Sequence, residues 1–213
     1  MVDLVLFDMD GVIFEGGNFW LDLHKLMGTE EQAWQLWNGL GTHAYNRLSN
    51  VTAKKLWRQK PSDKFWELIY ARKTITGIDE VFTYLNKNNI KSAIISSGPY
   101  QLAERAQQLF GISEIRANRL GIGEDGKFTG EVDIQVDDNH KDIPSKEIMS
   151  GFGATYDTTA MIGDTRSDVS IARIVSVSIA YNSNDSTLLE ACRYRLGSGE
   201  IRKVVDLLRE QER

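Results

Sequence analysis

Short apolar runs alternate with stretches of helical periodicity along most of the chain. The runs cover residues 2–7, 91–95, 159–162 and 175–180, and three of them end in polar residues or glycine. Such short, continuous runs are typical of buried strands in a parallel sheet. Apolar residues recur at helical spacing in 78–88, 100–110, 166–174 and 199–208. Strands that alternate with helices predict an α/β fold with a parallel sheet flanked by helices and right-handed crossovers.

Two stretches interrupt this alternation. Residues 19–75 contain no strand candidate and hold all 5 tryptophans, which predicts three or four helices inserted after the first strand. In residues 118–135 an Asp125-Gly126 pair lies between two extended runs, a pattern typical of a β-hairpin. We therefore expect a core of residues 1–15 and 76–213, a helical cap of residues 16–75, and a hairpin excursion from the core.

Composition narrows the class of protein. The chain has 213 residues, of which 41% are apolar, and its net charge of −5 disfavours binding to nucleic acid or to an anionic membrane. Asp8 and Asp10 interrupt the apolar start, and no apolar run approaches the roughly 20 residues that cross a bilayer. The single cysteine, Cys192, excludes an intramolecular disulfide and fits a reducing compartment. We expect a soluble, cytoplasmic protein.

Acidic side chains follow two of the predicted strands. Asp8 and Asp10 follow the first strand, and Asp164 follows the third, with Asp168 one helical turn later. The carboxyl ends of parallel strands share one edge of the sheet, where ligands bind. Four carboxylates packed there would repel one another, and Mg²⁺, which prefers oxygen ligands, would compensate their charge. We expect Mg²⁺ to be held by Asp8, Asp164, the backbone carbonyl of Asp10 and, directly or through the other ligands, Asp168.

A metal site beside hydroxyl groups at a helix start suits a phosphoryl group. Ser96, Ser97 and Gly98 follow the second strand, where Ser96 and backbone N–H groups can cradle phosphate oxygens. Asp8 is then the candidate nucleophile, and Asp10 is the candidate general acid and base. A cation should complete the cradle. Lys146, just inside a helix that Pro144 begins, is the best-placed lysine, with Lys141 and Lys127 as alternatives.

These features together resemble the haloacid dehalogenase superfamily. Asp8-Met9-Asp10-Gly11-Val12 resembles its first motif, Ser96 its second, Lys146 its third, and residues 163–168 (Gly-Asp-Thr-Arg-Ser-Asp) its fourth, in the family's order. The resemblance implies a Rossmann-like catalytic core with a helical cap inserted after the first motif. It also implies that Asp8 is the nucleophile and Asp10 the acid and base. The second aspartate of the first motif favours phosphatases over dehalogenases, which lack it.

Within this superfamily the chain is most similar to the phosphoserine phosphatases, at residues 95–98, 117–120 and 126–132. It departs from them in the cap. The glutamate that holds the amino group of serine would fall at residues 16–18 (Gly-Gly-Asn), with Glu15 slightly early. The arginine that binds the serine carboxylate would fall near Lys55 or Arg58, which makes Arg58 a candidate substrate contact. The phosphatase chemistry therefore transfers better than the phosphoserine substrate.

The sequence supports one main functional hypothesis and two alternatives. The main hypothesis is a Mg²⁺-dependent hydrolase that acts on a small phosphorylated metabolite through an aspartyl-phosphate intermediate. A phosphomutase of the same fold, similar to β-phosphoglucomutase, would return the phosphoryl group to a sugar instead of to water. A receiver-like module phosphorylated on Asp8 is the third hypothesis. The large insert and Asp10 disfavour it, because a signalling phosphate should be long-lived.

Overall fold

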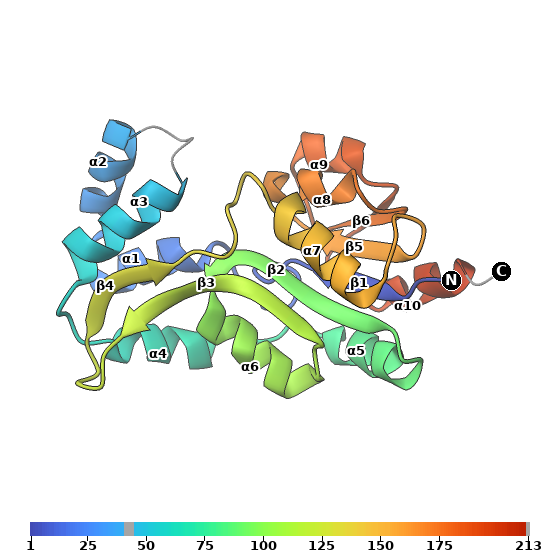
Figure 1. The fold of residues 1–213 in the computed structure, drawn as a ribbon, viewed down its shortest axis with the longest axis horizontal. Helices are drawn as coiled ribbons and strands as arrows, with labels where there is room; N and C mark the ends of the chain where they lie inside the picture. Colours follow the sequence, from blue (N-terminus) through green and yellow to red (C-terminus); the bar gives the residue numbers. More distant parts are fainter. Residues whose placement is uncertain (41–44, 212–213) are drawn as a thin grey trace.

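A seven-stranded sheet forms the centre of the molecule (Figure 1). In the computed structural model, residues 1–40 and 45–211 are described, apart from the side chains of 39–40 and 45–48. The strand order is β4-β3-β2-β1-β5-β6-β7, and every neighbouring pair is parallel except β3 with β4. The strands are β1 (Leu4–Phe7), β2 (Lys91–Pro99), β3 (Glu114–Ile122), β4 (Phe128–Asp133), β5 (Thr159–Gly163), β6 (Val177–Tyr181) and β7 (Tyr194–Leu196). The predicted α/β fold with a largely parallel sheet is confirmed.

Helices cover both faces of the sheet. Successive side chains of a strand point to opposite faces. Val5 and Phe7 therefore pack in one apolar cluster with α5 (Ile78–Lys87), α6 (Tyr100–Phe110) and α10 (Lys203–Glu210). Leu4 and Leu6 pack in another with α7 (Asp142–Phe152), α8 (Val169–Ala172) and α9 (Ser186–Ala191).

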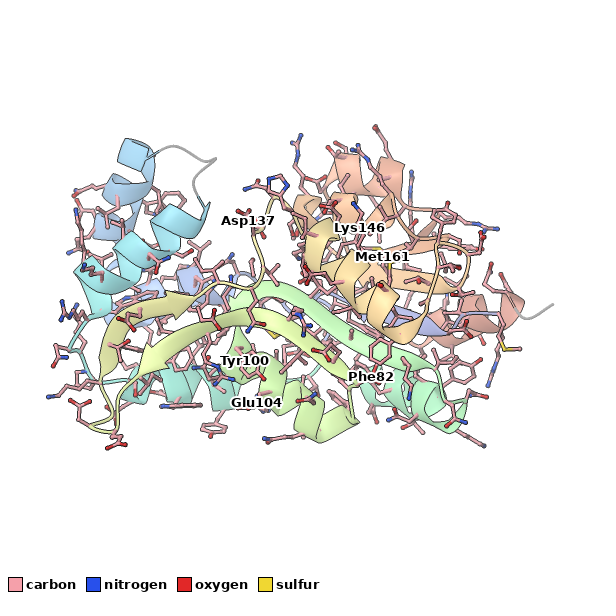
Figure 2. All side chains as sticks on the ribbon, in the orientation of Figure 1. Phe82, Tyr100, Glu104, Asp137, Lys146 and Met161 are labelled. Atoms are coloured by element: carbon pink, nitrogen blue, oxygen red, sulfur yellow. The ribbon has the colours of Figure 1, made fainter. Side chains whose placement is uncertain are left out.

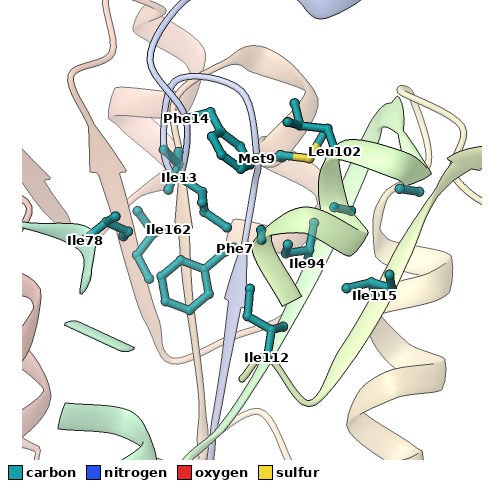
Figure 3. Close-up of a cluster of buried hydrophobic side chains, with 14 of the residues drawn as sticks. Phe7, Met9, Ile13, Phe14, Ile78, Ile94, Leu102, Ile112, Ile115 and Ile162 are labelled. Carbon is teal, nitrogen blue, oxygen red and sulfur yellow. The ribbon is translucent and has the colours of Figure 1, made fainter. Parts of the chain in front are cut away.

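The first of these clusters surrounds the carboxyl half of β1. Figure 3 shows Phe7 and Met9 in this cluster beside Ile94 of β2 and Ile162 of β5. Burial of these apolar side chains holds β1 between β2 and β5. Among the described helices, none is both long enough and apolar enough to cross a bilayer.

The insert between β1 and α5 is helical, as predicted. It contains α1 (Phe19–Met27), α2 (Glu30–Leu40), α3 (Tyr45–Thr52), a π-helical turn η1 (Ala53–Trp57) and α4 (Asp63–Ala71). Residues 41–44 of the predicted cap lie outside the described residues. The chain enters and leaves the insert side by side, because Ile75 N donates to Ile13 O and Glu15 N donates to Lys73 O. Phe128 of β4 contacts the rings of Trp57 and Phe65, so the hairpin packs against the insert.

Some elements differ from the sequence prediction. The first half of β3 pairs in parallel with β2, from Ala93 opposite Glu114, before its second half joins the hairpin. Neither that parallel half nor α9 nor β7 was predicted. β7 has three residues, none of them fully buried, so it carries no apolar run. The helix predicted over 166–174 is a 3₁₀ turn, η2 (Arg166–Asp168), followed by α8.

Candidate active site

The predicted acidic residues meet at the carboxyl ends of β1 and β5. Phe7 pairs with Ile94 of β2 and with Ile162 of β5, so β1 and β5 end at the same level, while β2 continues to Pro99. The Asp8 N–H donates to Ile162 O at 2.9 Å and continues this pairing past the end of β1. One carboxylate oxygen from each of Asp8, Asp164 and Asp168 lies within 4.8 Å of the others. The parallel register of β1 and β5 therefore produces the acidic cluster.

Lys141 is the cation at the centre of this cluster. Its side chain is buried, and Nζ donates to Asp8 Oδ1 at 2.9 Å and to Asp168 Oδ1 at 2.8 Å. Burial by itself would lower the pKa of Lys141, but the neighbouring carboxylates of Asp168 and Asp8 raise it above its ordinary value. Lys141 therefore stays charged and compensates the negative charge of Asp8 and Asp168.

The geometry does not support Lys146 as the cation beside the acidic residues, the role that the sequence predicted for it. Figure 2 labels Lys146 on α7, and its side chain is 58% exposed and bound to Asp142 Oδ2 at 2.6 Å. Helix α7 begins at Asp142, so Lys141 lies at its cap with access to the strand ends. Five residues further along a helix is a rotation of about 140°, which turns Lys146 to another side. The other alternative, Lys127, is exposed and pairs with Asp125 at 3.6 Å.

Asp168 is fully buried and holds both Lys141 and the loop after β5. Its Oδ1 accepts the bond from Lys141, and its Oδ2 accepts the backbone N–H groups of Asp164 and Thr165, each at 3.1 Å. These contacts orient the Asp164 backbone and the Lys141 ammonium at the same time. The predicted role through other ligands is thus the one that its contacts favour.

Asp10 lies where the core meets the insert. Its Oδ2 accepts the N–H of Phe19, the first residue of α1, at 3.1 Å, and its Oδ1 is buried without a partner in the described part of the chain. Burial raises the pKa of Asp10 to about 6, against the opposing effect of the Phe19 N–H. A carboxyl group with such a pKa can hold a proton near neutrality and release it again.

Asp8 and Asp164 fit a divalent cation. Burial is the main cause that raises the pKa of each, and the charge of Asp168 adds to it. Asp164 Oδ1 is buried and has no hydrogen-bond partner among the described residues. Gly11 leaves room for this carboxylate: its φ is +81°, and a Cβ there would lie 2.1 Å from Asp164 Oδ2. A hard cation would satisfy the orphaned oxygen and favour both ionised carboxylates.

Residues 96–98, at the carboxyl end of β2, have the features of a phosphate cradle. Gly98 N donates to Ser96 Oγ at 3.0 Å, and a Cβ on Gly98 would lie 2.6 Å from Met9 Cε. Ser97 Oγ donates to Asp138 Oδ1 at 2.9 Å, and Ser97 O accepts Trp20 Nε1 at 2.8 Å. The Ser97 side chain therefore holds the loop before α7, whereas Ser96 and Gly98 lie beside Asp10, whose Oδ2 would be 3.5 Å from a Cβ on Gly98.

Arg72, at the end of the insert, is a buried cation. The sequence did not indicate a role for it. Arg72 Nη1 donates to Glu15 O at 2.9 Å, and Nη2 donates to Asp22 Oδ2 at 2.7 Å. Arg58, the predicted substrate contact, is exposed and lies against Gly130 of β4. This contact does not bring Arg58 to the acidic cluster, so its substrate role stays a prediction.

A cavity of about 320 Å³ is lined mostly by residues of the insert, with Asn118 of β3 and Val132 of β4 at its border. We call it the aromatic cavity, because the residues that line it include Trp20, Trp34, Trp37 and Trp57, together with His24, Thr52, Asn118 and Val132. Asn118 Nδ2 also donates to Ser97 O at 3.1 Å. Trp20 and Asn118 thus border both the cavity and the loop of Ser96.

Comparisons with known proteins agree with this geometry. The family model of haloacid dehalogenase-like hydrolases matches residues 5–173. The phosphoserine phosphatase of Saccharomyces cerevisiae is 25% identical over 183 residues, which are 84% of this chain and 59% of that protein. The phosphoserine phosphatase of Idiomarina loihiensis is 27% identical over 138 residues, 64% of this chain and 61% of that protein. The chain thus spans about three fifths of the length of these relatives.

Solved structures show the same fold. A substrate-bound phosphoserine phosphatase superposes with a TM-score of 0.81 at 20% identity, covering 97% of this chain and 98% of the other. A phospho-aspartyl intermediate analogue of phosphoserine phosphatase superposes with a TM-score of 0.80 at 22% identity and the same coverage. At these identities the likeness establishes the fold. With the family model matching most of its length, the chain belongs to the haloacid dehalogenase-like hydrolases.

Proposed function

We propose that this protein is a metal-dependent phosphomonoester hydrolase with Asp8 as its nucleophile. The observation that carries the proposal is the contact of one buried lysine, Lys141, with both Asp8 and Asp168, beside Asp10 and Ser96. The similarity to phosphoserine phosphatases supports the same reaction. The expected partner is a small phosphorylated metabolite and the expected compartment is the cytoplasm, and both stay predictions.

In the first step an oxygen of the Asp8 carboxylate attacks phosphorus. The bond from phosphorus to the alcohol oxygen breaks as the bond from Asp8 to phosphorus forms. Asp10 gives its proton to the departing alkoxide, which leaves as the alcohol. Lys141 compensates charge on Asp8, and Ser96 with the N–H groups that follow it binds phosphate oxygens.

Asp8, Asp164 and the backbone carbonyl of Asp10 would hold the metal ion, which we take to be Mg²⁺. When bound, it supplies positive charge that lets an anionic nucleophile approach an anionic phosphate. Asp168 keeps Asp164 and Lys141 in place through the hydrogen bonds described above.

The second step releases phosphate. Asp10, now ionised, takes a proton from a water molecule, whose oxygen attacks the phosphorus of the aspartyl-phosphate. The bond between Asp8 and phosphorus breaks, and the Asp8 carboxylate and the protonated Asp10 are restored. The pKa of about 6 for Asp10 suits both proton transfers.

Release of inorganic phosphate from para-nitrophenyl phosphate with Mg²⁺ tests this proposal. Asp8→Asn should abolish turnover, because an amide oxygen is a poor nucleophile, while the circular dichroism spectrum stays that of the parent. Retention of most activity in Asp8→Asn would end the nucleophile assignment. Absence of any turnover by the parent protein, on this ester and on a panel of alkyl phosphates, would end the proposed function.

A further inference from the structure

The aromatic cavity borders residues 96–98, the proposed phosphate cradle. Trp20 donates its Nε1–H to Ser97 O at 2.8 Å, and Asn118 donates to the same carbonyl at 3.1 Å. Both residues line the cavity. Ser97 follows Ser96 directly, so the cavity is placed to receive the alcohol portion of an ester whose phosphate lies at Ser96.

A continuous series of ring contacts leads from this point to the surface. The Trp20 ring stacks on Trp57 with centroids 6.2 Å apart, and Trp57 contacts His24 at 4.6 Å. His24 contacts Trp37 at 5.6 Å, and Trp37 meets Trp34 edge-on at 4.8 Å. Trp34 is 48% exposed. Such walls bury aromatic and apolar groups well, because offset and edge-on ring contacts add to area burial.

The described side chains that line the cavity include no Asp, Glu, Lys or Arg. The one titratable side chain among them, His24, is kept neutral, because burial lowers its pKa to about 4. The buried Arg72 of the insert pairs with the partly exposed Asp22 instead. Desolvating the ammonium and carboxylate of phosphoserine in this cavity would therefore be costly.

One polar atom of the cavity lacks a partner. Thr52 lines the cavity, is 4% exposed, and its Oγ1 is buried without a hydrogen bond in the described structure. Buried hydroxyl groups are normally hydrogen-bonded, since an unpaired one costs free energy. A ligand with one donor or acceptor on its ring system would satisfy it.

We propose that the alcohol portion of the substrate is an uncharged aromatic group with one hydrogen-bonding atom, bound in the aromatic cavity. The inference rests on the proposed phosphatase function and names its substrate class: arylalkyl phosphate monoesters rather than phosphoserine. The volume of about 320 Å³ matches small-molecule sites, which begin at roughly 300 Å³.

Three primary alkyl phosphates of similar intrinsic reactivity test the inference: 2-(indol-3-yl)ethyl phosphate, 2-phenylethyl phosphate and O-phosphoserine. We expect kcat/KM for the aromatic esters to exceed that for phosphoserine by about 10- to 100-fold, the effect of burying one aromatic ring. The indole ester should be the better of the two, because its N–H can donate to Thr52 Oγ1. Thr52→Val should remove the difference between the two aromatic esters.

Trp34→Ala and its control Trp66→Ala separate cavity binding from general effects of losing a tryptophan. Trp66 lies on α4 and stacks on Tyr70, and it does not line the cavity. Trp34→Ala should reduce the ratio of kcat/KM between the indole ester and phosphoserine about 10-fold, whereas Trp66→Ala should leave this ratio unchanged.

The outcomes distinguish the two proposals. Turnover of phosphoserine equal to or better than that of the aromatic esters would overturn the substrate class while leaving the phosphatase function in place. A ratio unaffected by Trp34→Ala would do the same, and an indole preference that persists in Thr52→Val would remove Thr52 from the site. No turnover of any of the three esters, or of para-nitrophenyl phosphate, would overturn the proposed function itself.

Discussion

At the scale of single residues, two lysines five positions apart have opposite environments. Lys141 is buried between Asp8 and Asp168, whereas Lys146 is 58% exposed in a pair with Asp142. An exposed ion pair contributes little, because water screens both charges. A buried lysine between two carboxylates is different, since its removal leaves like charges together in a poorly hydrated place.

Lys141→Met should therefore reduce kcat for para-nitrophenyl phosphate by at least about 100-fold, the typical effect of losing a group that stabilises transition-state charge. The matched variant Lys146→Met should retain activity within a factor of two of the parent. Thermal unfolding of both variants shows whether the fold survives. Equal losses in the two variants, or a larger loss in Lys146→Met, would contradict the assignment.

At the scale of elements, the insert is attached to the core by two connecting segments that hydrogen-bond to each other and by one buried arginine. Arg72 follows α4 and binds Glu15 O and Asp22 Oδ2, and its guanidinium lies 5.5 Å from the centre of the Phe19 ring. Phe19 N in turn donates to Asp10, so the same contacts that hold α1 also position the proposed acid. The contacts at the base of the insert therefore link the position of α1 to that of the Asp10 carboxylate.

Arg72→Leu should lower the free energy of unfolding by about 2 kcal/mol, because it leaves a carbonyl and a carboxylate without their partner. Arg58→Leu, an exposed arginine of the same insert, should change it by less than about 0.5 kcal/mol. Urea denaturation followed by tryptophan fluorescence measures both values. A destabilisation by Arg58→Leu as large as that by Arg72→Leu would show that the buried contacts of Arg72 do not stabilise the protein specifically.

At the scale of the whole molecule, the acidic cluster links the stability of the fold to pH and to cation binding. The pKa of Asp164 is raised above its unfolded value of 3.8 to about 9, so ionising this group destabilises the metal-free fold increasingly as the pH rises above 3.8. A cation bound only by the folded state reverses this effect by mass action.

Mg²⁺ at ten times its dissociation constant should stabilise the protein at pH 7.5 by about 1.4 kcal/mol, which raises Tm by roughly 3–5 °C. Asp164→Asn should show little of this shift, and in EDTA its Tm should equal or exceed that of the parent, because the amide carries no charge. Differential scanning calorimetry gives both values. An equal Mg²⁺ shift in parent and variant would place the ion elsewhere.

The sequence by itself determined the α/β class, the place of the helical insert and the convergence of Asp8, Asp10, Ser96 and Asp164. These depend on local signals: buried runs form strands, and parallel strands bring their ends to one edge. Only the tertiary structure decided that Lys141 and not Lys146 joins the acids, that Asp168 orients its neighbours, and that the tryptophans enclose a cavity. Those outcomes depend on side-chain direction and on distances between segments far apart in the chain, which periodicity and motif spacing do not encode.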